Sequence, residues 1–123
     1  MCFTREYPDI VGEKYGLKDV PIYWLCHSVG EKRIDPRRLG ILGREIIRFI
    51  QQNSGSVVLL EGLEYLILHN GFQEVMRTIH SICEAVVQNA SLLIIPINPD
   101  ALNKRELALL ERNMEVIDFK NNI

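Results

Sequence analysis

The stretch Ser56-Val57-Val58-Leu59-Leu60-Glu61-Gly62 decides the fold of this chain. Its first part, Ser56 to Leu60, is a run of mostly branched apolar side chains that does not alternate with polar ones. Such a run is typical of a strand inside a parallel sheet that helices cover on both faces. Glu61 and Gly62 then mark the carboxyl end of this strand, which is where open α/β sheets place their ligands.

Short apolar runs and helical stretches alternate on both sides of this strand. Strands are predicted at Cys2–Thr4, Pro21–Cys26, Ser56–Leu60, Ser91–Ile97 and Glu115–Phe119. Helices are predicted to begin at Pro8, at Asp35-Pro36, at Phe72 and just after Asn103. This alternation predicts one α/β domain over residues 1–123, a three-layer sandwich with a mostly parallel central sheet of about five strands.

The helical stretches carry their own start and stop signals. Asp35 can accept hydrogen bonds from the free N–H groups of a helix start, and Pro36 suits the first helical position. Residues 72–87 repeat apolar side chains at helical spacing and form the clearest element of the chain. Asn103 followed by Glu106 has the pattern of a capping box. The polar segment 28–33 and the position of His69 are assigned to loops.

Composition and charge exclude several classes of protein. The 123 residues carry 14 Lys and Arg against 16 Asp and Glu, a net charge of −2, which is not the charge of a dedicated nucleic-acid binder. The apolar runs are far shorter than the roughly 20 residues of a membrane span, so we expect a cytoplasmic protein without membrane insertion. Three widely spaced cysteines predict neither a disulfide framework nor a zinc site. No cofactor or metal is expected.

Several motifs resemble an archaeal family catalogued as domain of unknown function 835. The motifs are Phe3-Thr4-Arg5-Glu6-Tyr7-Pro8, Ile22-Tyr23-Trp24-Leu25, Ile34-Asp35-Pro36, Val58 to Leu66, Asn70-Gly71-Phe72 and Ile95-Pro96-Ile97-Asn98-Pro99. They span nearly the whole chain in the order found in that family. In that family the domain is often attached to larger archaeal signalling or membrane proteins, so the resemblance implies a regulatory or interaction role.

A more distant resemblance bears on the reaction that such a fold could catalyse. The order of elements is similar to a RecA-like or KaiC-like ATPase core that lacks its first strand and its phosphate loop, and residues 57–64 are similar to a Walker B strand. Glu61 stands where that family usually has Asp, and none of the eight glycines is followed by Lys. Because no GxxxxGK[ST] loop exists to hold the phosphates, the sequence argues against ATP hydrolysis by this chain alone.

Three carboxylates at predicted strand ends are the candidate catalytic residues. Glu61 and Glu64 follow the central strand, and Glu6 follows the first strand, so the three would meet if these strands are neighbours. Their functional interpretation is a metal site or a general base, whereas solvated or helix-capping acids are the favoured interpretation. Cys26 and His27 are adjacent in a strand and point to opposite faces, so they are poorly placed to act as nucleophile and base.

The one basic segment of the chain offers a candidate partner-binding surface. Residues 31–48 contain six basic and three acidic side chains, a net charge of +3. Arg37, Arg44 and Arg48 recur at helical spacing and are predicted to share one helix face, which could meet an acidic partner or a phosphate group. A solvated helix face is preferred over nucleic-acid binding, because no aromatic residues are interleaved with the arginines.

These observations predict a non-catalytic regulatory or protein-interaction module of the cytoplasm, with a protein partner or a second copy of itself. The alternative is a nucleotide- or Mg²⁺-dependent enzyme or ligand-binding domain that uses Glu61, Glu64 and Glu6. A further alternative is weak nucleic-acid binding through the face of Arg37, Arg44 and Arg48. A cavity at the carboxyl ends of the strands would favour ligand binding, and side chains filling that place would favour the module.

Overall fold

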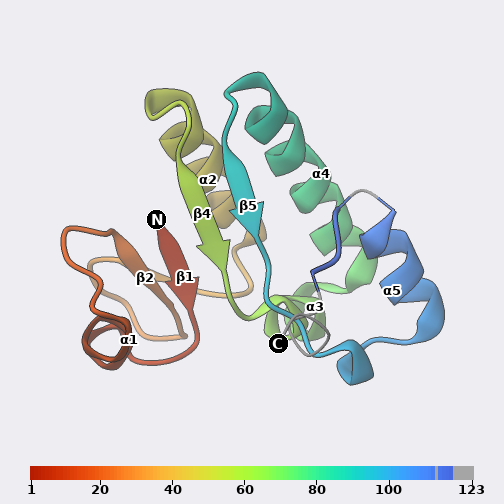
Figure 1. Cartoon of the computed structure of the whole chain (residues 1–123). Coiled ribbons are helices and arrows are strands. Elements are labelled where there is room, and N and C mark those ends of the chain that lie inside the picture. The colour runs from red at the N-terminus through yellow and green to blue at the C-terminus, as the bar shows by residue number, and fades with distance from the viewer. Residues whose placement is uncertain (113, 118–123) are drawn as a thin grey trace.

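The structure, a computed structural model, describes residues 1–112 and 114–117 (Figure 1). Its strands are β1 (Cys2–Thr4), β2 (Ile22–Leu25), β3 (Arg33–Ile34), β4 (Val57–Leu60) and β5 (Leu92–Ile94). Its helices are α1 (Pro8–Tyr15), α2 (Leu39–Gln52), α3 (Leu63–Asn70), α4 (Phe72–Gln88) and α5 (Lys104–Glu111), with a 3-10 turn η1 (Pro99–Ala101). The predicted α/β class is confirmed.

All five strands run parallel in one sheet, in the order β3-β2-β1-β4-β5. β1 lies in the middle, where Phe3 is opposite Tyr23 of β2 and Leu60 of β4. The chain adds β2 and β3 on one side of β1 and then crosses back to add β4 and β5 on the other side. The carboxyl ends of β1 and β4 therefore meet where the strand order reverses, which is the usual ligand position in open α/β sheets.

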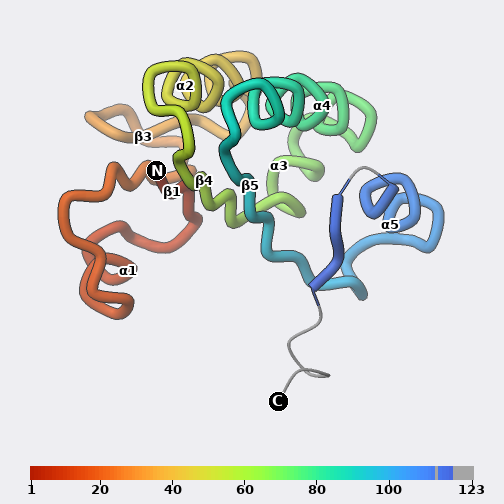
Figure 2. Tube along the Cα trace, turned by 45° about the horizontal axis from the view of Figure 1, so that its top comes forward, coloured from red at the N-terminus to blue at the C-terminus, as the bar shows by residue number. Residues whose placement is uncertain are grey.

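Helices α2 and α4 lie side by side across one face of the sheet, which we call the covered face (Figure 2). The strand side chains that point to this face are shielded from solvent: Phe3, Val58 and Leu60 are each at most 1% exposed. Ile46 of α2 and Ile79 of α4 pack in the same buried cluster, which residues of α3 and α5 extend. The hydrophobic core of the protein therefore sits on the covered face.

Helices α2 and α4 approach each other closely at Gly43. A Cβ atom at this position would lie 3.0 Å from Cγ2 of Thr78, which is closer than carbon atoms normally pack. The Thr78 hydroxyl donates a hydrogen bond of 3.2 Å to the backbone carbonyl of Glu74, and this bond fixes its rotamer. The missing side chain at Gly43 therefore sets the spacing of the two helices.

The opposite face of the sheet is only half covered. Among the described helices, α1 alone lies on this side, over β1 and β2, and a Cβ on its Gly12 would lie 3.6 Å from Cδ1 of Ile22 (Figures 1 and 2). The half formed by β4 and β5 we call the open face. Its residues are Val57, Leu59, Leu92 and Ile94. The predicted three layers are present, but the expectation that the strand over residues 56–60 is covered on both faces is wrong, since Val57 is 49% exposed.

Two features before α2 differ from the sequence prediction. The helix predicted from Pro36 begins at Leu39, because Asp35 accepts a hydrogen bond of 2.9 Å from the backbone N–H of Arg37 and closes a turn ahead of the helix. The segment assigned to a polar loop ends in β3, a strand of two residues that pairs with β2. Local side-chain pattern cannot reveal a strand this short, since it exists only through its partner.

The second half of the chain contains three further differences. The sequence does not predict α3, and this helix includes His69, a position that the sequence places in a loop. β5 occupies only residues 92–94 of the predicted strand over 91–97. Residues 115–117 of the last predicted strand are not a strand, and residues 118 and 119 lie outside the described residues. Within the described part of the chain, no helix has both the length and the apolar content needed to cross a membrane.

Candidate functional site

The carboxyl edge of the sheet brings together two of the predicted strand ends. β1 and β4 are neighbours, and the backbone N–H of Glu61 donates a hydrogen bond of 2.9 Å to the carbonyl of Phe3. The Thr4 hydroxyl donates to Oε1 of Glu61 at 3.3 Å and accepts from the backbone N–H of Glu6 at 3.0 Å. The ends of β1 and β4 therefore lie next to each other, which is the arrangement that a site built on the predicted carboxylates needs.

The three candidate carboxylates do not form one cluster. Oε1 of Glu61 is bound by Thr4, and Oε1 of Glu64 accepts a hydrogen bond of 2.8 Å from the backbone N–H of Asn98 in the segment after β5. The side chain of Glu6 is exposed. Among the described residues, no group of three His, Cys, Asp or Glu side chains is arranged to hold a metal ion. Glu61 thus links the end of β4 to the end of β1, and Glu64 links α3 to the segment after β5.

The exposed side chain of Arg5 lies over the turn that follows β4. Its guanidinium carbon lies 3.8 Å from the centre of the Tyr65 ring, a cation–π contact. Gly62 follows β4 with a φ of 109°, and a Cβ there would lie 3.0 Å from Cγ of Arg5 and 3.3 Å from Cδ1 of Leu25. Glycine is required at this turn both by its backbone angle and by the space that Arg5 takes. The Arg5 side chain therefore lies against Gly62, at the point where the strand order reverses.

A polar chain beside Arg5 joins the ends of β2 and β3 to α3. Nε2 of His27 lies 2.9 Å from the Tyr65 hydroxyl, and Nδ1 of His27 lies 3.6 Å from Oδ1 of Asp35. Arg37 donates two side-chain hydrogen bonds to Asp35, at 3.0 and 2.7 Å. The side-chain hydrogen bonds from Arg37 hold the pKa of Asp35 well below its ordinary value of 3.8. The ring of His69 lies edge-on to that of Tyr65, with centroids 4.6 Å apart.

Sequence reasoning missed this polar chain as a unit. Tyr65 and His69 were not recognised as neighbours because α3 was not anticipated, although their spacing of four residues is that of one helix turn. Cys26 and His27 are not paired: Sγ of Cys26 lies 3.3 Å from Oγ of Ser28, whereas His27 faces Tyr65. This chain of contacts can hold the ends of β2, β3 and α3 together, and the group that it places next to the His27 imidazole is the Tyr65 hydroxyl rather than the Cys26 thiol.

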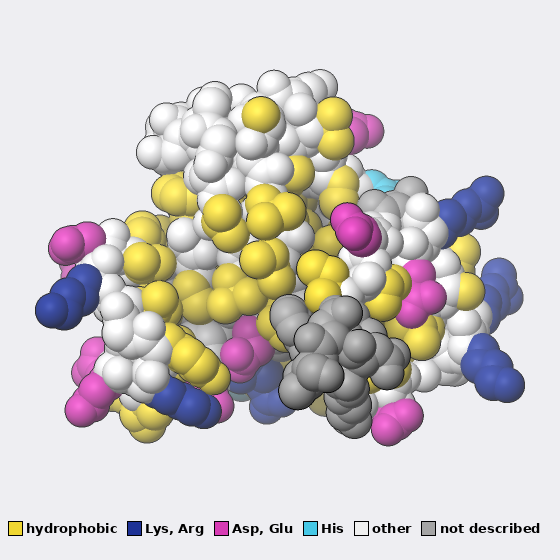
Figure 3. Space-filling view, viewed as in Figure 1, with side chains coloured by type: hydrophobic (Ala, Val, Ile, Leu, Met, Phe, Trp, Pro, Cys, Tyr) yellow, Lys and Arg dark blue, Asp and Glu magenta, His cyan; other side chains and the backbone are white. Residues whose placement is uncertain are grey.

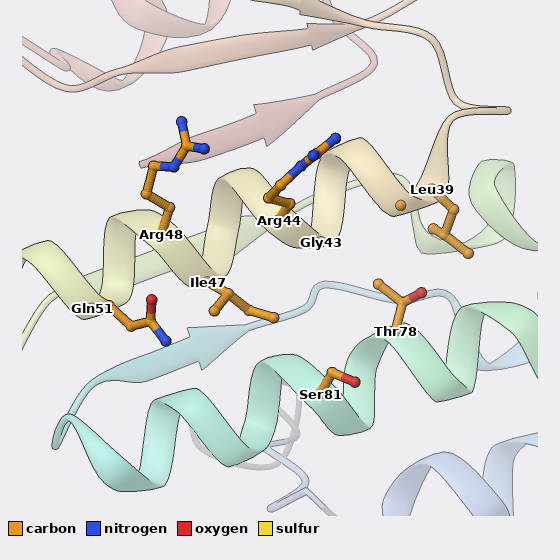
Figure 4. Close-up of a pocket in the computed structure, with 9 residues that line it drawn as sticks. Leu39, Gly43, Arg44, Ile47, Arg48, Gln51, Thr78 and Ser81 are labelled. Carbon is orange, nitrogen blue, oxygen red and sulfur yellow. The ribbon is translucent and has the colours of Figure 1, made fainter.

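The predicted basic face is divided in the structure. Arg44 and Arg48 lie beside a groove of about 470 Å³ between α2 and α4 (Figure 4). Figure 4 shows Gln51 pointing toward α4, whereas Arg44 and Arg48 point away from it. Arg48 is 3.9 Å from Glu45, one turn away on the same helix. Arg37 precedes the helix and is bound to Asp35, so the prediction that it shares a face with the other two arginines is wrong.

The open face is the largest departure from the expected packing. Val57 is 49% exposed, Leu92 is 52% exposed and Ile94 is 44% exposed. Val57 is opposite Leu92, and Leu59 is opposite Ile94, so the four side chains form one continuous surface. Figure 3 shows hydrophobic side chains gathered in the middle of this side of the molecule, over the strands. Apolar surface of this kind on a folded protein commonly marks an interaction site.

Comparison with known protein families identifies the family to which the chain belongs. A family model described as "Protein of unknown function (DUF835)" matches residues 1–114. The chain therefore belongs to this family, in agreement with the resemblance carried by its strand-end motifs. No curated protein matches the chain, and no solved structure does.

Proposed function

We propose that this member of the DUF835 family is a protein-interaction module that works by contact through its open face, without catalytic chemistry of its own. One observation carries the proposal: Val57, Leu92 and Ile94 stand about half exposed, side by side, on two parallel strands. Parallel sheets are normally covered by helices on both faces. A binding partner would supply the cover that the described chain does not.

The partner segment that suits the open face is an amphipathic helix with an aliphatic stripe. α1 already occupies the other half of the same layer, and a second helix beside it, about 8–10 Å away, would complete the layer. β4 and β5 have four and three residues, so the contact spans roughly 10–13 Å of strand. Because burial of a whole Leu or Ile side chain stabilises by about 1.5–3 kcal/mol, completing the burial of these half-exposed ones adds roughly 1 kcal/mol each.

The carboxyl edge supports contact rather than ligand binding. The Arg5 side chain lies against Gly62, and the carboxylates of Glu61 and Glu64 each accept a hydrogen bond from within the chain. The alternative, a nucleotide- or Mg²⁺-dependent site, predicts that Mg²⁺ with a nucleotide raises the melting temperature and that Glu61→Gln removes the rise. We rank this alternative second.

The test is selection of binders from a library of amphipathic helical peptides, followed by affinity measurement with matched variants. Leu92→Lys should weaken the selected peptides at least about tenfold, because it places a charge in the centre of an apolar contact. Leu68→Lys is the control, since Leu68 is equally apolar and strongly exposed but lies on α3, outside the open face. Peptides that bind both variants equally well, or a selection without binders, would count against the proposal.

A further inference from the structure

We infer that the helix which covers the open face is α1 of a second copy of this chain, so that the protein forms a symmetric dimer. The inference rests on the proposed function, because it names the occupant of the open face. Its starting point is that two apolar features on one side of the described molecule are exposed at the same time. One is the open face, and the other is the outer side of α1.

The outer side of α1 presents an aliphatic side chain to solvent. Val11 is buried and Gly12 approaches Ile22, so these two residues mark the side of the helix that faces the sheet. Because successive helical residues are rotated by about 100°, Ile10 lies on the opposite side of the helix from Gly12. Ile10 is 57% exposed. Tyr7, one turn earlier, is also exposed and lies edge-on to Trp24.

A two-fold axis brings these two features together. This axis runs parallel to the strands and lies within the layer that contains α1. A half turn about it sets the second sheet facing the first and exchanges the β2 side with the β5 side. The second copy's α1 then lies over β4 and β5 of the first copy, beside the first copy's own α1. The reciprocal contact forms at the same time, so one closed interface buries both apolar features twice.

The chemistry of the two surfaces suits this contact. Ile10 would pack against the aliphatic side chains of the open face, while the charged residues that flank it on α1 would remain at the rim. Those flanking residues are Asp9, Glu13 and Lys14. The apolar centre is small compared with the roughly 800 Å² that each partner buries in a standard interface. We therefore expect a dimer that dissociates at micromolar concentration.

The first experiment measures oligomeric state by sedimentation velocity over about 1–100 µM protein. The parent chain should change from monomer to dimer across this range. Ile10→Glu and Leu92→Glu, one on each side of the contact, should each raise the dissociation constant at least about tenfold. Val87→Glu is the matched control, because Val87 is 80% exposed on α4, which lies on the covered face, and this variant should dimerise like the parent. All three sites are exposed, so each variant should fold.

The second experiment tests the arrangement of the two copies. A spin label on Lys14→Cys, in a background of Cys26→Ser and Cys83→Ser, is mixed with unlabelled but ¹⁵N-enriched protein. Lys14 is exposed on α1, one turn after Ile10, so the label should broaden the amide signals of β4 and β5 in the other copy. The same label on Val87→Cys should leave those signals unchanged.

The outcomes separate this inference from the proposed function. A chain that stays monomeric throughout, or a dimer that survives both Ile10→Glu and Leu92→Glu, would overturn the α1 arrangement. If the chain is monomeric and helical peptides still bind the open face, the proposed function stands and the occupant is another protein. If the chain is monomeric and no peptide binds, both proposals fail.

Discussion

Val57 and Val58 are consecutive valines in β4, yet their side chains lie in different environments. Val58 points to the covered face and has no exposed surface, whereas Val57 points to the open face and is 49% exposed. The covered face receives α2 and α4, and the open face receives no described helix over β4 and β5. The difference teaches that one strand can serve two purposes: one row of side chains holds the fold together while the other row stays available for contact.

The largest effect that separates the two faces should come from leucine truncation. Leu60 is 1% exposed on the covered face, and Leu60→Ala should lower the free energy of unfolding by about 2–5 kcal/mol, because it leaves a cavity in a packed core. Leu92→Ala on the neighbouring strand removes the same atoms from the open face. It should lower stability by no more than about 1 kcal/mol in the monomer, because only about half of the Leu92 side chain is buried. Urea denaturation at low protein concentration measures both values.

Equal losses for the two variants would break the comparison. They would mean that Leu92 is buried in solution, either by a second copy or within its own chain. Repeating the denaturation at high protein concentration distinguishes these cases, since only burial by a second copy depends on concentration.

A smaller effect should come from the helix layer on the covered face. Gly43→Ala improves helix propensity by about 1 kcal/mol but places a Cβ atom 3.0 Å from Thr78, and overpacking of this kind costs about 1–3 kcal/mol. Gly40→Ala in the same helix has no atom within 4 Å of its new Cβ and should stabilise the protein. Thermal denaturation should therefore place the stability of Gly43→Ala below that of Gly40→Ala by roughly 1–3 kcal/mol.

The double variant Gly43→Ala with Thr78→Ser makes this expectation sharper. Serine lacks the Cγ2 atom that the new Cβ would meet, so the double variant should recover the stability that Gly43→Ala loses. Failure to recover would show that a different contact limits the spacing of α2 and α4.

The smallest effect should come from the polar contacts at the carboxyl edge. The hydrogen bonds from Arg37 lower the pKa of Asp35 below 3.8, so its carboxylate contributes stability above that pH, and the contribution is lost as pH falls further. Asp35→Asn should therefore melt at a lower temperature than the parent at about pH 7, and the gap should close toward about pH 2. Calorimetry across this range measures the gap.

Asp100→Asn is the control for this pH series. Asp100 is exposed and makes no ion pair with another described residue, so its replacement should change the melting temperature less than Asp35→Asn does at neutral pH. A gap for Asp35→Asn that stays constant from neutral to acidic pH would mean that its carboxylate charge does not stabilise the edge of the sheet.

Much of the fold could be predicted because most helices and strands have signals in their own local sequence. The spacing of apolar residues in α4, the capping box at Asn103 and the glycine after α1 each depend on residues within a few positions. α3 is less evident, because apolar residues lie on most sides of it: Leu66 is buried while Leu68 is exposed. β3 is defined by its pairing with β2 alone.

The candidate site was harder to predict than the fold. An apolar run such as Ser56–Leu60 reads as doubly covered, but whether a helix reaches each face depends on the path of the connecting segments. The segments that connect β3 to β4 and β4 to β5 both pass over the covered face. No described helix therefore lies over Val57 and Leu59. The sequence places Thr4 and Glu61 at the ends of two strands, so their contact could be predicted if the strands are neighbours. The contact of Arg5 with Gly62 depends on three-dimensional packing that the sequence does not reveal.

The central position of β1 has a consequence for how the chain folds. Thr4 and Glu61, which meet across the sheet, are separated by 57 positions. During synthesis, β1 can pair with β2 early, but its other edge has no partner until β4 leaves the ribosome several seconds later, at about 5–20 residues per second. Incomplete chains therefore expose one unpaired edge of the strand that becomes the centre of the sheet. A chaperone that shields strand edges during synthesis should raise the yield of folded protein more than one that acts on finished chains.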